Sequence, residues 1–421
     1  MNVWIVFIGE TLPMDDDSRE WRYGMLADAL VAKGHTVLRW APTFNHTLKK
    51  QRDKQYAAYK VNDHYSINLI HNKSYRKNIS LKRLLSYRGF AAHLKNAFDS
   101  VSVAPDLIIC GLPSPDACGV VTEYAKKNNI PVCIDIRDPW PDIFFRKLHP
   151  FLQALSQKLF SLVFYDTKKI LRQADALIAV SQKYLDWGCM KSARGVGCHD
   201  KVFPIGYKAI GNSAEKNVRI LQWLQDRGVE RHKFICCYFG QLESTYDVET
   251  ILNVAKHFNI KKYNKIQFVL CGKGRSEQAV IDLSRQQDNL VYLGWVSPET
   301  ITSIMDISAV GLASYAVNAP QSLPNKPFEY MGGALPIVSS LQGELAEMID
   351  VYNCGLTYEA GSAEQMASAI LDLYNNPEKV VVMSKNASEL FAKEFSAGKI
   401  YPILVDYLEK IVSEKLSRIS H

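Results

Sequence analysis

The chain has 421 residues, 47% of them apolar and 22% charged, with a formal net charge of +7. This composition is typical of a globular protein of two or three domains and argues against disorder. No apolar run reaches the roughly 20 residues that a helix needs to cross a bilayer, and the N-terminus lacks the basic start of a signal peptide. A cytoplasmic protein is therefore expected. The nine cysteines include no CxxC pair, which favours reduced core residues over a metal site.

Taken in chain order, short apolar runs rich in β-branched residues alternate with amphipathic stretches of helical periodicity. Apolar strands that alternate with helices of about 10–15 residues predict parallel sheets flanked by helices. The strand-like runs are 3–8, 106–110, 131–136, 176–180, 234–240, 266–272, 289–294, 309–313 and 335–340. The clearest helical stretches are 18–34, 247–258 and 276–287.

The alternation runs twice, and a polar stretch containing Pro204 and Gly206 separates the two series. We therefore predict an α/β protein with two Rossmann-like domains, 1–205 and 206–397. The final residues, 398–421, are expected to form a helix that crosses back onto the first domain. In such sheets ligands bind at the carboxyl ends of the strands, so the loops that follow the strands are the places to search for a site.

The loop after the first strand begins at Gly9, a candidate ligand contact. No GxGxxG motif follows it, which argues against a dinucleotide cofactor. The aspartate triplet 15–17 stands just before the first helix, and we expect it to cap that helix rather than to bind Mg²⁺. Arg19 and Arg22 lie one turn apart on the helix and are interpreted either as ligands of a phosphate or acceptor or as surface residues.

Two further loops of the first series carry polar side chains. His46 follows a strand-like run and is a candidate for substrate contact or proton transfer, although a loop histidine can also be structural. Arg137 and Asp138 follow the run 131–136. They are predicted either to contact the reacting groups of a substrate or to neutralise each other.

The second series also contains two informative loops. Gly240 ends a strand just before a helix that starts near Asp247, a geometry that favours an anion site. Gly272 and Gly274 let the backbone approach a flat ligand such as a base, although a lone GxG motif is a weak signal.

The most specific stretch is QSLPNKPFEYMGG, residues 321–333. Asn325 is expected to cap a helix that has Pro327 in its first turn. Lys326 then lies at the positive end of this helix, where it can pair with a diphosphate. Glu329 lies one turn further on, where its two oxygens suit the vicinal hydroxyls of a ribose. The alternative is a salt bridge between Lys326 and Glu329.

Residues 49–95 carry twelve lysines and arginines against two aspartates. Such a stretch attracts anions, whether lipid headgroups, diphosphates or nucleic acid, or it is simply a solvated face. Apolar side chains among the charges would add burial at a membrane interface. These side chains are Tyr65, Tyr75, Leu84, Tyr87, Phe90 and Leu94.

The stretch SLPNKPFEYMGGALPIV, residues 322–338, resembles the nucleotide-sugar signature of retaining glycosyltransferases with the GT-B fold, specifically family GT4 with its bacterial capsule and O-antigen enzymes. The resemblance covers most of the chain, because the segments 27–37, 135–142 and 294–315 also match in pattern and order. It implies a GT-B architecture, in which two Rossmann-like domains face each other across a deep cleft.

The resemblance also assigns roles to single residues. The signature usually places two glutamates eight positions apart, the second on the donor ribose and the first on the sugar. Glu329 matches the second, while the first position holds Gln321, which can bind sugar hydroxyls but carries no charge. An Arg and a Lys that relatives use against the diphosphate are replaced by Gln241 and Tyr246, which leaves Lys326 as the candidate cation. The other contacts expected at the nucleotide sugar are Asn325, Leu323, Gly9, Gly240, Gly272 and Gly274.

The implied reaction is transfer of a sugar, with retention, from a nucleoside-diphosphate sugar, with UDP as the expected nucleotide. The implied acceptor is a saccharide or a polyprenyl-diphosphate-linked saccharide in cell-surface polysaccharide synthesis. Catalytic roles are assigned to Gln321, Arg137, Asp138 and His46.

No metal ion and no cofactor are expected for such an enzyme. The expected location is the cytoplasm, with peripheral binding to an anionic membrane surface through residues 49–95, and no nucleic acid partner is expected. Two alternatives are a nucleotide-sugar 2-epimerase of the same fold and a non-catalytic, basic nucleic-acid-binding protein.

Overall fold

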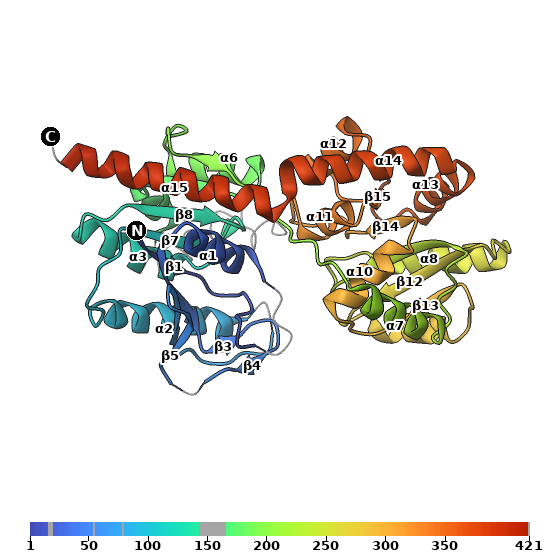
Figure 1. Ribbon diagram of the computed structural model, residues 1–421, viewed down its shortest axis with the longest axis horizontal. Helices are drawn as coiled ribbons and strands as arrows, with labels where there is room; N and C mark the ends of the chain where they lie inside the picture. The colour runs from blue at the N-terminus through green and yellow to red at the C-terminus, as the bar shows by residue number, and fades with distance from the viewer. Residues whose placement is uncertain (16–19, 54, 78–79, 143–165, 420–421) are drawn as a thin grey trace. The chain divides into compact units, whose positions relative to one another are not determined.

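The computed structural model describes residues 1–15, 20–53, 55–77, 80–142 and 166–419 (Figure 1). The chain divides into two compact units. The first comprises residues 1–204 together with 400–421, and the second comprises residues 205–399. None of the described helices is both long and apolar enough to span a bilayer.

The first unit is built on a twisted, mostly parallel sheet. Its strands are β1 (Asn2–Val6), β2 (Thr36–Pro42), β5 (Ala57–Asn62), β6 (Tyr65–Ile70), β7 (Leu107–Leu112), β8 (Val132–Ile136), β9 (Ala176–Ala179) and β10 (Lys201–Val202). Among the described residues their order is β10-β9-β8-β7-β1-β2-β6-β5, and the edge strand β5 is antiparallel to β6. The strand order reverses direction between β1 and β7, which is where ligands bind in doubly wound sheets.

Helices and one small hairpin surround this sheet. The helices are α1 (Arg22–Ala32), α2 (Leu81–Phe98), α3 (Pro115–Lys127), α5 (Thr167–Gln173) and α6 (Gln182–Ser192). The hairpin pairs β3 (Phe44–Asn45) with β4 (Lys50–Gln51). Helix α15 (Ala397–Ile419) packs along this unit as well, and its Glu409 and Lys415 form ion pairs with Lys33 and Asp175.

The second unit contains a fully parallel sheet in the order β13-β12-β11-β14-β15-β16 among the described residues. Its strands are β11 (Phe234–Phe239), β12 (Ile266–Cys271), β13 (Leu290–Tyr292), β14 (Val310–Ala313), β15 (Ile337–Ser339) and β16 (Gly355–Thr357). Its helices are α7 (Ala214–Gln225), α8 (Val248–Ile260), α9 (Glu277–Ser284), α10 (Pro298–Asp306), α11 (Asn325–Gly332), α12 (Glu344–Val351), α13 (Ala363–Asn375) and α14 (Pro377–Leu390), followed by the π-helical turn η2 (Phe391–Phe395).

Both faces of the second sheet are buried, as the continuous apolar letters of its strands predict. In β11, Cys237 and Phe239 join one core with Tyr330 of α11, while Cys236 and Tyr238 join the core on the opposite face. The predicted pair of Rossmann-like regions is confirmed.

Candidate active site

The side chain of Lys326 is buried in the first turn of α11, with 7% of its surface exposed. Its Nζ atom lies 3.5 Å from the ring centre of Tyr238 and 4.5 Å from that of Tyr246. Nζ has no hydrogen-bond partner among the described residues, so the alternative of a pairing with Glu329 is not formed through a hydrogen bond. The two rings stabilise the cation but accept none of its N–H groups in the manner of an oxygen.

Burial lowers the pKa of Lys326 well below its usual value, although the nearby carboxylate of Glu329 raises it. A buried ammonium without oxygen ligands is costly, and the cost falls when an anion binds against it. Glu329 is itself buried one turn further along the helix, with 5% of its surface exposed. The pair therefore presents a cation and a carboxylate from the same face of α11.

Three other polar atoms of this region are buried without a hydrogen-bond partner among the described residues: the hydroxyl of Tyr315, Oε1 of Gln321 and Oδ1 of Asn325. The N-cap of α11 is Pro324, so the prediction that Asn325 caps the helix is wrong. Buried polar atoms in native proteins are nearly always paired, so these exceptions are atoms that could form hydrogen bonds with a polar ligand. Leu323 lies in the same loop and packs against the apolar core.

Glycines shape the loops that follow β11 and β12. Gly240 has a φ of +132°, and a Cβ atom there would lie 3.3 Å from Nζ of Lys326. A Cβ on Gly272 would lie 1.8 Å from the carbonyl oxygen of Gly240, and one on Gly274 would lie 2.7 Å from the backbone of Leu242. The last two glycines are therefore required by contact between loops, whereas the sequence interpretation attributed them to a flat ligand.

The start of α8 is not an open anion site. The carboxylate of Asp247 accepts hydrogen bonds from the backbone N–H groups of Thr250 (3.1 Å) and Gly361 (3.0 Å). An acid already occupies the positive end of this helix, so the prediction of a backbone anion site near Asp247 is wrong. Tyr246 contacts the ammonium of Lys326 through its ring, while the backbone carbonyl of Gln241 accepts a hydrogen bond from Tyr238.

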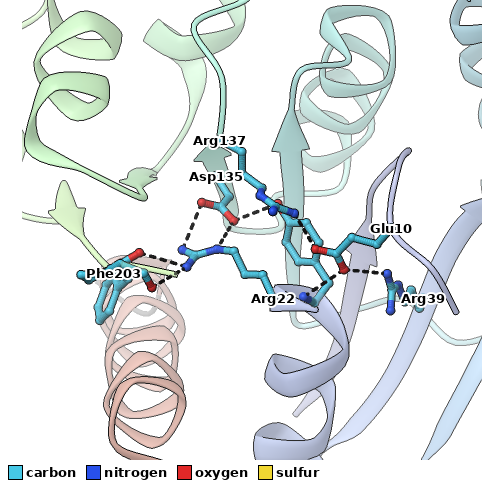
Figure 2. A network of polar contacts seen from close by, with 8 residues as sticks. Glu10, Arg22, Arg39, Asp135, Arg137 and Phe203 are labelled. Atoms are coloured by element: carbon cyan, nitrogen blue, oxygen red, sulfur yellow. Dashed lines mark hydrogen bonds and ion pairs between the residues drawn. The ribbon is translucent and has the colours of Figure 1, made fainter. Parts of the chain in front are cut away.

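In the first unit, Arg22 has no exposed surface, and Figure 2 shows its polar contacts. Its Nε and Nη2 atoms donate to the carboxylate of Asp135 at 2.7 and 3.2 Å, and Nη1 donates to the carbonyls of Phe203 and Pro204 at 2.9 and 3.0 Å. Tyr23 donates its hydroxyl to the same carboxylate at 2.8 Å. With these hydrogen bonds and no exposed surface, Arg22 neither reaches a phosphate nor lies on the surface, so both interpretations of this residue are wrong. Arg19 lies outside the described residues.

Glu10 connects a second group of side chains in Figure 2. Its carboxylate accepts hydrogen bonds from Arg39 at 2.9 Å and from Arg137 at 2.5 Å. The guanidinium of Arg137 also lies 5.1 Å from the ring centre of Phe7. Arg137 is therefore paired with Glu10. The alternative, a salt bridge between Arg137 and Asp138, is not formed. Gly9, the residue before Glu10, has a φ of +136°.

Asp138 is half-buried, and burial raises its pKa to about 6, although the nearby charges of Arg137 and Arg83 lower it. This carboxyl group therefore exchanges its proton close to neutral pH. His46 lies 2.7 Å from the hydroxyl of Tyr75 through Nδ1. Burial, together with the charges of Arg83 and Lys49, lowers the pKa of His46 to about 3, so its ring is neutral at physiological pH and can act through hydrogen bonds but not as a cationic acid.

Asp15, from the aspartate triplet, does not cap α1, whose N-cap is Trp21. Its two oxygens each lie 2.7 Å from the guanidinium of Arg52, and one of them also accepts from the side chain of Asn45. Burial raises the pKa of Asp15, but the hydrogen bonds and charge of Arg52 outweigh it and hold the pKa below its usual value. The capping prediction is wrong for Asp15, and the other two aspartates lie outside the described residues.

Solved structures share this fold over almost the whole chain. Sucrose-phosphate synthase from Thermosynechococcus elongatus has a TM-score of 0.70 at 15% identity, covering 98% of this chain and 99% of that one. HepE from Anabaena, solved with UDP, has a TM-score of 0.63 at 16% identity over 97% and 100% of the two chains. A trehalose-6-phosphate synthase from Burkholderia multivorans has a TM-score of 0.68 at 12% identity over 98% and 100%. The fold is thus the GT-B fold of glycosyltransferases.

Each half of the chain also matches a family model. Residues 22–188 match the model of glycosyltransferase family 4, and residues 221–390 match that of the glycosyl transferases group 1. Among curated protein sequences, none matches this chain. The chain belongs to the GT-B glycosyltransferase superfamily, and it is a glycosyltransferase.

The replacement Asp135→Asn tests whether the Arg22 pair is structural. Removing the charge leaves a buried guanidinium uncompensated, and we expect the free energy of unfolding to fall by about 3–5 kcal/mol. A urea titration followed by tryptophan fluorescence measures the change. The control is Asp406→Asn, which removes an exposed partner of Lys33 and should cost less than about 1 kcal/mol. Equal effects of the two replacements would contradict the structural role.

Proposed function

We propose that the protein transfers a sugar from a nucleoside-diphosphate sugar to a hydroxyl group of a saccharide acceptor, with retention at the anomeric carbon and without a metal ion. The observation that carries this proposal is the buried ammonium of Lys326, which lies beside two tyrosine rings and has no hydrogen-bond partner in the part of the chain that the structure describes. UDP is the proposed nucleotide, since the HepE structures with a similar fold contain UDP and UDP-glucose.

In this proposal Lys326 binds the diphosphate, with the backbone at Gly240 beside it. Glu329 accepts hydrogen bonds from the ribose hydroxyls, and Gln321 and Asn325 bind hydroxyls of the donor sugar through their side-chain oxygens. The bond between the anomeric carbon and the diphosphate oxygen breaks while the acceptor oxygen bonds to the same face. The departing phosphate takes the acceptor's proton. Lys326 accelerates the reaction because negative charge grows on the leaving group in the transition state.

Asp138 and His46 are proposed to bind the acceptor in the first unit. Neutral His46 can orient a hydroxyl through its ring nitrogens, and Asp138 can accept the same kind of hydrogen bond when it is ionised. We further propose that the acceptor belongs to cell-surface polysaccharide synthesis, such as that of capsule or O-antigen, and is carried on a lipid. The presence of an exposed basic and apolar surface on α2 supports a lipid-linked acceptor.

Replacing Lys326 with methionine should change binding and stability in opposite directions. Loss of the charged hydrogen bonds to the diphosphate should weaken UDP binding by about 10–100-fold. Removal of a desolvated ammonium should leave the unfolding free energy unchanged or higher. Calorimetric titration with UDP and urea unfolding measure the two effects.

The matched control for this variant is Lys385→Met, which removes a lysine exposed on α14 and should alter neither quantity appreciably. Tight UDP binding by the Lys326→Met protein would refute the diphosphate role. Weaker binding accompanied by unfolding would show that Lys326 is structural instead.

The proposed chemistry can be tested with a panel of nucleotide sugars and saccharide acceptors in the presence of EDTA. We expect a glycosidic product with the anomeric configuration of the donor, identified by the coupling constant of its anomeric proton in the NMR spectrum. EDTA should not change the rate at which this product forms. Glu329→Ala should remove this activity while leaving the fold intact. An inverted product, or activity restored only by Mg²⁺ or Mn²⁺, would contradict the proposal. An epimerised sugar released without an acceptor would identify a 2-epimerase.

The apolar side chains that the sequence suggests for a membrane surface are not exposed, since Leu84 is half-buried and the other five are buried. Tyr65, Tyr75, Tyr87, Phe90 and Leu94 are all buried, with at most 4% of their surface exposed, so they cannot enter a bilayer in this fold. On the first two turns of α2, however, Leu81 is 69% exposed and Leu85 is 56% exposed, with exposed Lys82 and Arg88 on the same helix. We propose that this end of α2 binds an anionic membrane surface.

The double replacement Leu81→Glu and Leu85→Glu should abolish flotation with vesicles that contain phosphatidylglycerol. Each change removes apolar burial and adds a charge that the lipid repels. The control is Ile260→Glu, because Ile260 is 76% exposed on α8 in the other unit. Flotation of the double variant at the level of the unmodified protein would remove α2 as the membrane-binding element.

A further inference from the structure

The two ring nitrogens of His46 have different surroundings. This half-buried side chain stands in the turn between β3 and β4, which follows β2 at the carboxyl end of the first sheet. Nδ1 lies 2.7 Å from the hydroxyl of Tyr75 and 3.3 Å from Nζ of Lys49. Nε2 has no hydrogen-bond partner among the described residues and is not buried. The protein therefore holds one ring nitrogen and leaves the other accessible to a ligand.

The direction of the bond between Tyr75 and His46 follows from the groups behind Tyr75. Tyr75 and Tyr87 form a buried aromatic layer with ring centres 6.3 Å apart. Arg83 donates to the hydroxyl oxygen of Tyr87 through Nε at 3.2 Å and Nη2 at 3.0 Å, which uses both lone pairs of that oxygen. The hydroxyl of Tyr75 also interacts with Tyr87 and Arg83. Neither of them can accept its proton, so Tyr75 donates this proton to Nδ1 of His46.

Lys49 is a second donor to the same nitrogen. Burial and the charge of Arg83 lower the pKa of Lys49 to about 8, so at pH 7 the side chain is mainly an ammonium, which donates and cannot accept. A nitrogen that accepts hydrogen bonds carries no proton. Burial and the charges of Arg83 and Lys49 also lower the pKa of His46 to about 3, so the ring holds a single proton at neutral pH. That proton is therefore on Nε2.

The turn that carries His46 is fixed by its own hydrogen bonds. Oδ1 of Asn45 accepts from the backbone N–H groups of Thr47 and Leu48 at 2.8 and 2.9 Å, and the side-chain amide of Asn45 donates to Asp15. A side chain that is held in place before binding loses less entropy when the ligand arrives. The Nε2–H group of His46 is thus an oriented hydrogen-bond donor.

An Nε2–H group can donate a hydrogen bond but has no lone pair with which to take a proton. His46 in this tautomer therefore does not act as a general base toward the hydroxyl of an acceptor. A hydrogen bond donated to the attacking oxygen would also occupy a lone pair that the new bond requires. The chemistry of this group suits an oxygen that accepts a hydrogen bond and does not itself react.

We propose that Tyr75 is a positioning residue that fixes the Nε2–H tautomer of His46, and that His46 donates a hydrogen bond to an oxygen of the acceptor saccharide other than the attacking hydroxyl. This inference rests on the proposed glycosyl transfer and deepens it, because it decides between substrate contact and proton transfer for His46. The proton of the attacking hydroxyl is then left to the departing phosphate, as in the proposed reaction.

Nitrogen-15 NMR of the full-length protein, labelled at its histidines, tests the tautomer at pH 7.5. The signals of His46 are assigned by their loss in His46→Gln. We expect an unprotonated Nδ1 and a protonated Nε2, with shifts that stay constant from pH 8 to pH 5. Tyr75→Phe should convert part of the population to the Nδ1–H tautomer, because only the longer contact with Lys49 remains.

The matched control is Tyr56→Phe, which alters a tyrosine of the same unit that is 54% exposed and should leave the signals of His46 unchanged. The signals of the other histidines report whether each variant keeps its fold. A protonated Nδ1 or a doubly protonated ring in the unmodified protein would overturn the inference, even if Tyr75→Phe fails to fold. Signals of His46 that do not change in a folded Tyr75→Phe protein would overturn it too.

Kinetics with the panel of nucleotide sugars and acceptors separates a hydrogen bond from proton transfer. His46→Asn, whose amide is too short to replace Nε2, should raise the KM for the acceptor by about tenfold with little change in kcat. His46→Gln places an amide N–H group near the position of Nε2 and should recover most of the lost affinity. An unchanged KM in His46→Asn, or a fall in kcat of about 100-fold or more in both variants, would overturn the inference. If the unmodified protein forms no glycosidic product, the proposed function fails while the NMR result on the tautomer stands.

Discussion

The buried ion pair between Arg22 and Asp135 is the constraint that fixes the edge of the first unit's sheet where the acceptor is proposed to bind. A guanidinium in this position is tolerable only because Asp135, Phe203 and Pro204 supply its oxygen ligands. The pair joins the start of α1 to the end of β8 and to the segment that follows β10. The loop containing Asp138 begins directly after this anchored strand, so the position of the proposed acceptor contacts follows from the pair.

Lys326 is also a buried cation, but its ammonium is not surrounded by oxygen atoms as the guanidinium of Arg22 is. Arg22 forms four hydrogen bonds to oxygen and has no exposed surface, whereas Nζ of Lys326 lies beside two tyrosine rings and has no hydrogen-bond acceptor among the described residues. A cation with complete oxygen ligation stabilises the fold, and one without it costs stability unless a ligand completes it. The same criterion therefore distinguishes an arginine that stabilises the fold from a lysine that is proposed to bind a substrate.

The sequence predicts the repeated parallel sheets well, because continuous apolar strands between helices are a local pattern. It also selects Lys326 and Glu329, because their spacing within one helix is local too. It fails for Arg22 and Asp15, whose partners lie 113 and 37 residues away and leave no periodic signal. The sequence does not predict strand β5 because none of its six residues is buried: two are partly exposed and four are exposed, as expected for an edge strand.

Residues 49–95 show why composition alone could not separate two functions. In the linear sequence, the aromatic and basic residues of this stretch together suggest one amphipathic membrane surface. Folding divides them, because Tyr75 and Tyr87 turn inward to form the layer beneath Lys49 and Arg83, while Leu81 and Leu85 stay outside on α2. Arg83 lies between these leucines, two residues from each, which is about half a turn of helix. Its side chain therefore leaves α2 on the opposite side, toward the buried rings, while Leu81 and Leu85 face outward.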